Sequence, residues 1–302
     1  MASRGGGHKR AVIGMRMNVA QNTSTTTLRE STTALRARCR HVRSLIIKGI
    51  GSVGMGHLGG SLSLVEALVV IYSRHMRIDP RQPKLQGRDR FVLSKGHGGP
   101  GLYAVLASFG YFPEDMMTTL NQLGTNLPSH PDMNRTPGID MTTGSLGQGL
   151  SAAVGIAAGA RLAGDGSRVY ALIGDGESQE GQIWEAALYA AHLRLSNLIA
   201  FTDYNKMQID GPIERVNGLE PLVDKWKAFN WNAVAVDGHD IDQIDAAIVA
   251  AKKVSGRPSM IVLNTIKGKG VSFIERAATS NHNMAITAEQ VAMALEEIAA
   301  GS

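Results

Sequence analysis

The chain has 302 residues, of which 43% are hydrophobic and 19% charged, so it can bury a sizeable core and its bulk is not disordered. The longest uncharged stretch, residues 141–160, is rich in Gly, Ser, Thr and Gln and is not continuously apolar, which excludes a transmembrane helix. Cys39 is the only cysteine, which excludes an intrachain disulfide and favours a cytoplasmic protein.

The positive charge is concentrated in the N-terminal part of the chain. Residues 1–48 hold ten Lys and Arg against one acid, a net +9, whereas residues 49–302 hold 21 against 25, a net −4. No aromatic residue interleaves with the N-terminal charges, so we expect no nucleic-acid partner. We interpret residues 1–24 as a basic, disordered extension and residues 25–302 as one folded domain.

The first part of this domain is predicted to consist of helices and glycine-rich turns around one strand. Hydrophobic spacing predicts an amphipathic helix over residues 28–50 and, after a glycine-rich turn, an apolar helix with Ser61 as its N-cap and Ile71 near its end. Residues 90–94 are expected to form a short buried strand, and residues 102–109 a helix after a second glycine-rich turn.

The second part alternates between strands and helices. The expected helices cover residues 146–162, 182–193, 241–253 and 288–299, and the expected strands cover residues 168–173, 197–202, 231–236 and 260–265. Apolar runs joined by helical crossovers form βαβ units, whose strands are parallel. The sequence therefore predicts an α/β domain with a doubly wound, mainly parallel sheet and helices on both faces.

Polar groups follow two successive strands of this pattern. A Gly-Asp-Gly run occupies residues 174–176 after the first strand, and Asn205 follows the second. Ligands of such sheets bind beyond the carboxyl ends of the strands, where residues 174–176, 203–207 and 267–270 should converge. A carboxylate, an amide oxygen and backbone carbonyls suit Mg²⁺ or Ca²⁺ with positions left open for a diphosphate, although Gly-Asp-Gly alone is also ordinary turn chemistry.

Several histidines lie in loops that should reach the same edge of the sheet. Neutral imidazole donates a hydrogen bond at one nitrogen and accepts one at the other, which suits a polyhydroxylated sugar. Singly each is a common structural hydrogen-bonding residue, but together they indicate a site: His57, His97, His130 and His282. We assign the remaining histidines to the N-terminal segment, helix surfaces and loops. For Lys267 and Lys269, contact with a phosphate or partner and a solvated turn remain open.

Seven segments, in one order along residues 25–300, resemble the motifs of transketolases. They are GHLGGS (56–61), RFVLSKGHG (90–98), SHPD (129–132), TTGSLGQGL (142–150), GDGESQEGQIWEA (174–186), DYNKMQIDG (203–211) and TIKGKG (265–270). The resemblance covers only the family's first domain, the one with the thiamine-diphosphate-binding fold. It implies the N-terminal subunit of a split, two-chain transketolase.

The resemblance also implies which residues hold the cofactor. Thiamine diphosphate would bind through Mg²⁺, with Ca²⁺ or Mn²⁺ as alternatives. The implied metal ligands are the side chains of Asp175 and Asn205 and the backbone carbonyl of Met207. The implied cofactor-binding residues are Gly144, Ser145, Leu146, Gly147, Gly174, Asp175, Gly176, Glu180 and Asn205. Ser145 stands where the family has proline, which leaves that turn less rigid.

The activity implied by the resemblance is transfer of a two-carbon ketol unit from a ketose phosphate to an aldose. The four loop histidines would then contact the sugar and transfer protons, with the surroundings of His282 departing from the family pattern, and Glu180 would join a proton network between subunits. The family's remaining catalytic groups have no place in this sequence. We therefore expect a C-terminal transketolase subunit as partner, in an α₂β₂ assembly, and no activity from this chain alone.

The sequence leaves several alternatives open. The sugar could be an ordinary pentose phosphate or a branched or sulfonated sugar. Other thiamine-diphosphate enzymes, the α chain of 2-oxo-acid dehydrogenases and deoxyxylulose-phosphate synthase, are disfavoured by the histidines and by the missing second half respectively. No GxGxxG motif follows the strand at residues 168–173, which disfavours a nucleotide-binding oxidoreductase. The intact Asp175, Asn205 and Glu180 disfavour a non-catalytic cofactor-binding subunit.

Overall fold

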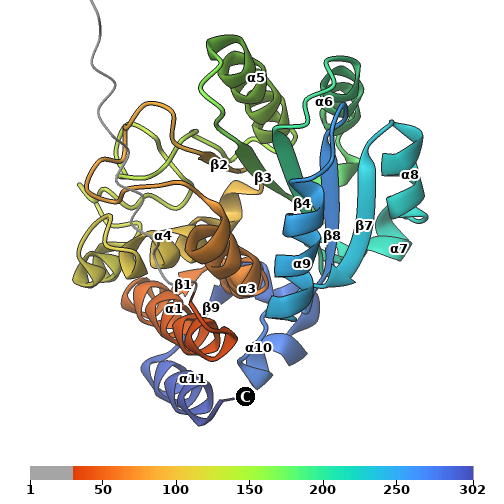
Figure 1. The fold of residues 1–302 in the computed structure, drawn as a ribbon. Helices are drawn as coiled ribbons and strands as arrows, with labels where there is room; N and C mark the ends of the chain where they lie inside the picture. The colour runs from red at the N-terminus through yellow and green to blue at the C-terminus, as the bar shows by residue number, and fades with distance from the viewer. Residues whose placement is uncertain (1–29, 302) are drawn as a thin grey trace, which may run out of the picture.

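Five parallel strands form the central sheet of the computed structural model, which describes residues 30–301 (Figure 1). In spatial order the strands are β2 (Arg90–Leu93), β3 (Val169–Gly174), β4 (Leu198–Tyr204), β8 (Ser259–Asn264) and β7 (Asn232–Asp237). The extension expected at residues 1–24, with His8, lies outside the described residues. Every neighbouring pair in this sheet is parallel, as the predicted βαβ arrangement requires.

The two faces of the sheet belong to two separate hydrophobic clusters, because side chains alternate along each strand. On β3, Tyr170 and Leu172 join one cluster, whereas Val169, Ala171 and Ile173 join the other. The first cluster contains α1 (Thr32–Val53), α3 (Val65–Val70), α4 (Gly99–Ser108) and α9 (Ile241–Ala251), and the second contains α5 (Gln148–Ala163), α6 (Gly181–His192) and α8 (Leu222–Ala228). The predicted doubly wound α/β fold is therefore confirmed.

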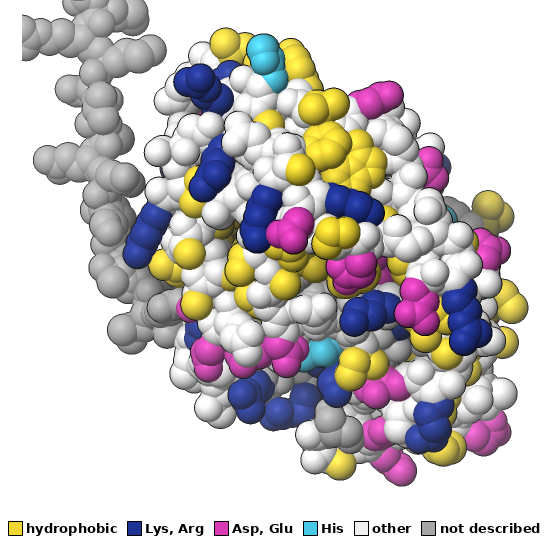
Figure 2. All heavy atoms as spheres, turned by 90° about the vertical axis from the view of Figure 1, so that its right-hand side faces the viewer, with side chains coloured by type: hydrophobic (Ala, Val, Ile, Leu, Met, Phe, Trp, Pro, Cys, Tyr) yellow, Lys and Arg dark blue, Asp and Glu magenta, His cyan; other side chains and the backbone are white. Residues whose placement is uncertain are grey.

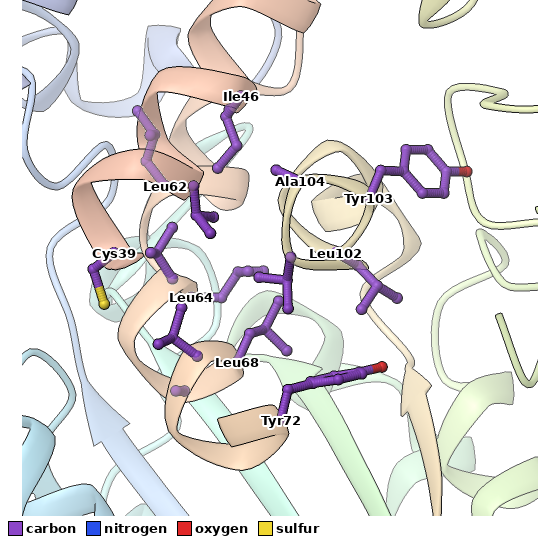
Figure 3. Packing of buried hydrophobic residues seen from close by; sticks show 14 of the residues in the cluster. Cys39, Ile46, Leu62, Leu64, Leu68, Tyr72, Leu102, Tyr103 and Ala104 are labelled. Carbon is purple, nitrogen blue, oxygen red and sulfur yellow. The ribbon is translucent and has the colours of Figure 1, made fainter. Parts of the chain in front are cut away.

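The larger cluster is built mainly of aliphatic side chains from helices (Figure 3). Leu64 and Leu68 from the α3 region lie between Ile46 of α1 and Leu102 of α4, and Cys39 is buried in the same cluster. The last helix, α11 (Ala288–Ala300), packs against α1. These contacts fix the loops at the carboxyl ends of the strands on a rigid base.

Short elements complete the chain between the sheet and its helices. Two-residue strands pair as β1 (Met55–Gly56) with β9 (Met284–Ala285) and as β5 (Met207–Gln208) with β6 (Gly211–Pro212). The short helical segments are α2 (Leu58–Leu62), η1 (Ile71–His75), η2 (Gly96–Gly98), η3 (Glu114–Thr119), η4 (Gly176–Gln179), α7 (Ile213–Val216), α10 (Ser272–Arg276) and η5 (Ala278–Asn281).

Two details differ from the sequence prediction. Ser61 does not cap a helix but lies inside α2, and the single helix expected up to Ile71 is divided into α2, α3 and the π-helical turn η1. Gly59 lies inside this earlier helix and packs tightly in a long-range contact that the local pattern does not encode: a Cβ atom there would lie 2.2 Å from Oδ1 of Asn281. In addition, β4 continues through Asp203, which the sequence pattern places in the following loop.

The surface of the described chain carries both signs of charge. On the face shown in Figure 2, Lys and Arg side chains alternate with Asp and Glu and with scattered apolar groups, in line with the small net charge of the body. Between residues 30 and 301, no helix combines the length and the hydropathy that crossing a bilayer requires.

Candidate active site

The tips of the neighbouring strands β3 and β4 bring the two predicted polar segments together. Gly174 lies opposite Asp203 in the sheet register, so the residues that follow both strands leave the sheet at the same edge. Asp175 is 3% exposed, and its carboxylate accepts the backbone N–H of Gly176 at 2.7 Å and that of Lys206 at 2.6 Å. The predicted convergence of these segments is confirmed.

Three oxygen-bearing groups line one cavity of about 210 Å³ at this edge: the side chains of Asp175 and Asn205, and Met207. The Asn205 amide is oriented by two contacts, since Nδ2 donates to Asp203 Oδ2 at 3.3 Å and Oδ1 accepts the N–H of Met207 at 3.2 Å. The carbonyl oxygen of Met207 accepts a hydrogen bond from Nζ of Lys267 at 3.3 Å. The three residues that carry the carboxylate, amide and carbonyl oxygens thus line the same wall.

The electrostatics of this wall fit a divalent cation. Burial, reinforced by the negative charge of Asp203, raises the pKa of Asp175 to about 7, so its charged form lacks compensation from the protein alone. Within residues 30–301, no cluster of three or more His, Cys, Asp and Glu side chains could hold a metal. An ion here would therefore need the amide and carbonyl oxygens and oxygens of a bound ligand, which is the donor set that Mg²⁺ prefers.

Glu177 organises the turns around the cavity and was not singled out from the sequence. Its buried carboxylate accepts the N–H of Gly174 at 2.9 Å, the N–H of Gly147 at 3.0 Å and the hydroxyl of Ser94. Burial raises the pKa of Glu177, whereas these donors favour its ionised form. Its position two residues after Asp175, in η4, is the one sequence signal that could have identified it.

The turn at residues 144–147 lies beside the same cavity. Gly144 and Gly147 have φ angles of 148° and 84°, which side chains rarely allow. A Cβ atom on Gly144 would lie 3.3 Å from the His130 ring. Ser145 and Leu146 are exposed, with Leu146 lining the cavity. Glu180 also lines it, and is exposed at the start of α6.

The four predicted histidines form a cluster. The ring centre of His57 lies 5.8 Å from that of His97, 5.5 Å from that of His130 and 5.4 Å from that of His282. The rings of His97 and His282 are 4.7 Å apart, and both residues also line the cavity beside Asp175. These side chains come from four separate segments of the chain, so only the tertiary fold brings them together.

The histidines are held neutral at neutral pH. Burial and the neighbouring His130 lower the pKa of His57 to about 4, and burial with the charge of Lys267 lowers that of His282 to about 3. Burial lowers the pKa of His97 and of His130 as well. A neutral ring offers one donor and one acceptor, which suits hydroxyl groups and proton transfer.

Two lysines that sequence reasoning did not assign to the site also line the cavity. Lys95 is 1% exposed and forms a buried ion pair with Asp203. Burial by itself would raise the pKa of Asp203, but the charge of Lys95 and the hydrogen bonds to the carboxylate hold this pKa below its usual value. Lys267 is 5% exposed, and burial followed by the charge of Lys95 lowers its pKa to about 8. Of the two possibilities left open for Lys267, a solvated turn is wrong. Lys95 follows the end of β2 and Lys267 the end of β8 within a few residues, which is the available signal.

Among residues 30–301, the other histidines do not line the cavity. His41 is exposed and pairs with Glu114 at 2.7 Å, and His192 is exposed at the end of α6. His75, expected on a surface, is instead buried against Asp245 at 2.9 Å. His239 lies in the loop after β7, with Nδ1 3.1 Å from Glu66 Oε2.

Comparison with known proteins supplies close relatives. The family model described as "Transketolase, thiamine diphosphate binding domain" matches residues 35–300. The chain is 58% identical over 257 residues to the 6-deoxy-6-sulfo-D-fructose transketolase subunit SqwG of Clostridium sp. (strain MSTE9), covering 85% of this chain and 93% of that protein. It is 39% identical over 256 residues to a subunit of the apulose-4-phosphate transketolase of Actinobacillus succinogenes, covering 85% and 92% respectively.

Solved structures of longer proteins share the fold. Transketolase from Leishmania mexicana superposes with a TM-score of 0.82 at 30% identity, covering 88% of this chain and 41% of that one. A transketolase from Pichia stipitis in complex with sedoheptulose 7-phosphate gives a TM-score of 0.78 at 34% identity, covering 89% and 44%. The chain thus spans less than half the length of these solved proteins, but nearly the full length of the Clostridium and Actinobacillus relatives.

Proposed function

We propose, from the premise that this chain belongs to the transketolase family, that it is the N-terminal subunit of a split transketolase that moves a two-carbon ketol unit from a ketose to an aldose. Residues 25–302 would form its thiamine-diphosphate-binding domain. The free, buried Cys39 suits a reducing cytoplasm, where we place the enzyme.

The observation that carries the proposal is the shared wall of Asp175, Asn205 and Met207 at the tips of β3 and β4. These residues would hold Mg²⁺, with Ca²⁺ or Mn²⁺ as substitutes, through a carboxylate, an amide and a carbonyl oxygen. A metal ion is the expected bridge to a diphosphate, because a helix N-terminus contributes only about 0.3–1 kcal/mol toward an anion at an exposed site.

Thiamine diphosphate, when bound, would supply the nucleophilic carbon and the electron sink for breaking the bond of the ketose. Gly174 and Gly176 would let the backbone approach the diphosphate, and the turn of Gly144, Ser145, Leu146 and Gly147 would contact the other end of the cofactor. Glu180, exposed at the rim, would meet the partner subunit and join a proton network across the interface. This chain thus binds and orients, while the cofactor carries the reaction.

The histidine cluster would hold the sugar and move its protons. His57, His97 and His282 are neutral and lie within 6 Å of one another between ring centres, so each presents one donor and one acceptor to hydroxyl groups. His130 lies beside Gly144, where it would contact the hydroxyl next to the broken bond. Positioned acid–base groups of this kind contribute about 10²–10⁴-fold to a rate.

The names of the relatives support a choice of substrate and partner. The high identity to a subunit named for 6-deoxy-6-sulfo-D-fructose, and the lower identity to one named for apulose 4-phosphate, favour a ketose with a terminal anion. A sulfonated ketose is the first donor to test, and ketose phosphates are the second. The partner would be a C-terminal transketolase subunit in an α₂β₂ assembly.

Ketol transfer by the purified chain, with and without that partner, tests the proposal. Thiamine diphosphate, Mg²⁺, the sulfonated ketose and an aldose acceptor are supplied, and the transferred product is measured. We expect turnover only from the two chains together. Turnover by the lone chain, or calorimetric binding of NAD(H) in place of thiamine diphosphate, would contradict it.

A further inference from the structure

The turn after β8 is held by hydrogen bonds at both of its ends. At one end the backbone N–H of Ile266 donates to Nε2 of His239 at 2.9 Å. At the other, the carbonyl of Lys269 accepts from Nε of Arg43 at 2.9 Å. Between them the N–H of Gly268 donates to the carbonyl of Gly59 at 3.0 Å. Lys267 lies between these anchors.

Both terminal anchors converge on one buried carboxylate, Glu66 of α3. Glu66 is 7% exposed and Arg43 is 6% exposed, and Nη2 of Arg43 lies 2.7 Å from Glu66 Oε1 and 2.9 Å from Oε2. The other neighbour of Glu66 is Nδ1 of His239 at 3.1 Å. We call Arg43, Glu66 and His239 the Glu66 triad. It joins α1, α3 and the loop after β7 to the turn.

The hydrogen bonds define the protonation of His239. Since the Ile266 backbone can only donate, Nε2 must be the acceptor and carries no proton. The neutral ring then carries its proton on Nδ1 and donates it to the Glu66 carboxylate. Glu66 therefore fixes both the tautomer and the orientation of the ring that holds the turn.

Gly270 shows that the local backbone is adapted to this arrangement. Its φ angle is +92°, and a Cβ atom there would lie 2.7 Å from Nε of Arg43. Any larger residue would push the guanidinium away from the Lys269 carbonyl and from Glu66. Arg43 approaches the turn closely only because this position lacks a side chain.

The group held out by the turn is the ammonium of Lys267. Its Nζ lies 3.3 Å from the Met207 carbonyl oxygen and 3.4 Å from Nδ1 of His282, so it contacts both the proposed metal site and the histidine cluster. A long, flexible side chain keeps such a position only if its backbone is fixed. Small displacements of groups near a reaction are costly, about 10²-fold in rate for 1 Å.

We propose that the Glu66 triad is a positioning device that fixes the 265–270 turn at both ends and thereby holds Lys267 in the active-site cavity. Glu66, Arg43 and His239 touch neither the proposed metal ligands nor the histidine cluster directly, so they act through the turn. That this cavity is an active site rests on the proposed function, whereas the placement of Lys267 by the triad does not.

Two substitutions of His239 distinguish its hydrogen bond with the Ile266 backbone from its contact with Glu66. In His239→Asn the amide reaches about as far as Nδ1, so it can still contact Glu66 but no longer Ile266. In His239→Gln the amide oxygen reaches about as far as Nε2 and can accept the Ile266 N–H. His75→Asn is the matched control, because it removes another buried histidine–carboxylate contact, with Asp245, near the opposite ends of the strands.

The measurement is the rate of reductive methylation of Lys267 in the full chain, followed by peptide mass spectrometry, with buried Lys95 as internal reference. We expect His239→Asn to raise the Lys267 rate at least about ten-fold, equivalent to about 1.4 kcal/mol. Lys95 should be unchanged in the same sample. His239→Gln should restore most of the protection, and His75→Asn should leave Lys267 as in the parent chain.

An unchanged Lys267 rate in His239→Asn would overturn the proposal, as would equal acceleration of Lys95 or equal acceleration in His75→Asn. If His239→Asn does not fold, Glu66→Gln takes its place under the same criteria, since it keeps the volume and removes the charge. The labelling requires neither a partner nor a sugar. A negative result would therefore leave the proposed function standing, and a failure of ketol transfer would leave the positioning device standing.

Discussion

The backbone N–H of Lys206 donates to Oδ2 of Asp175 at 2.6 Å, across 31 residues of sequence. This bond joins the segment after β3 to the segment after β4 and fixes the carboxylate beside Asn205 and Met207. The alignment of the proposed metal ligands is therefore a property of the folded chain itself. It makes the contribution of each group testable.

Replacing Asp175 with Asn should abolish metal-dependent cofactor binding without unfolding the chain. Asn is isosteric with Asp and removes a buried carboxylate, whose pKa is already raised to about 7 by burial and by the charge of Asp203. Since loss of groups that only orient metal ligands costs about 10–100-fold in affinity, we expect at least about 100-fold weaker binding of thiamine diphosphate with Mg²⁺ in calorimetric titrations. Exposed Asp224→Asn is the control, and unchanged affinity in Asp175→Asn would remove Asp175 from the site.

Acid should destabilise the folded chain through the histidine cluster. The folded-state pKa values of His57 and His282 are about 4 and about 3, below the ordinary 6.5. Between each folded-state value and pH 6.5, the unfolded chain therefore binds a proton on that ring and the folded chain does not. The contribution of these rings to stability is complete above pH 6.5 and is lost as the pH falls. Each contributes at most about 1.4 kcal/mol per pH unit, and less where solvent screens it.

Urea denaturation at about pH 7 and about pH 5 measures this effect. The free energy of unfolding should fall on acidification, and the fall should be smaller in His282→Gln, which cannot take up the proton. His192→Gln, exposed on α6, should keep the full pH dependence. Equal pH dependence in both variants would show that the cluster does not govern acid stability.

The two glutamates near the cavity should behave in opposite ways. Glu177→Ala removes the acceptor of three buried donors, each costing about 1–3 kcal/mol when left unsatisfied, so we expect a loss of at least about 2 kcal/mol in stability. Glu180→Gln, at an exposed position, should change stability by less than about 0.5 kcal/mol. It should lower ketol transfer in the two-chain enzyme. Unfolding free energies and ketol-transfer rates of both variants test these roles. A loss of stability in Glu180→Gln with none in Glu177→Ala would contradict them.

The buried pair of Lys95 and Asp203 should show strong coupling. Lys95→Met leaves a buried carboxylate without its cation, which typically costs about 3–5 kcal/mol. Adding Asp203→Asn should recover part of this loss, because the uncompensated charge is then removed. Unfolding free energies of the two single variants and the double variant measure the interaction. Additive losses would mean that the pair is not coupled.

Much of the fold followed from the sequence because the strands are apolar runs between helical segments. The tips of β3 and β4 could be placed together from the parallel rule alone, and the four histidines from their loops at one edge. The cavity contacts of Lys95 and Glu177 could not, since each depends on partners from distant segments: Lys95 meets Asp203 108 residues away, and Glu177 meets Gly147.

The helix boundary predicted at Ser61 was wrong. Ser61 has the character of an N-cap, yet α2 begins at Leu58, where Gly59 packs closely against Asn281 from a distant segment. Lys267 was ambiguous because a lysine beside Gly268 in a short loop looks solvated until the contacts that bury it are known. Long-range contacts decided both cases.

The pairing of β1 with β9 also has a consequence for biosynthesis. Met55 and Gly56 lie against Ala285 and Met284, so the strand next to His57 is completed by a segment near the end of the chain, next to His282. During translation the earlier strand must wait without its partner while residues 57–283 are made. The four clustered histidines can therefore assemble only after β9 has been made, and a nascent chain that stalls before β9 would leave the cluster unassembled.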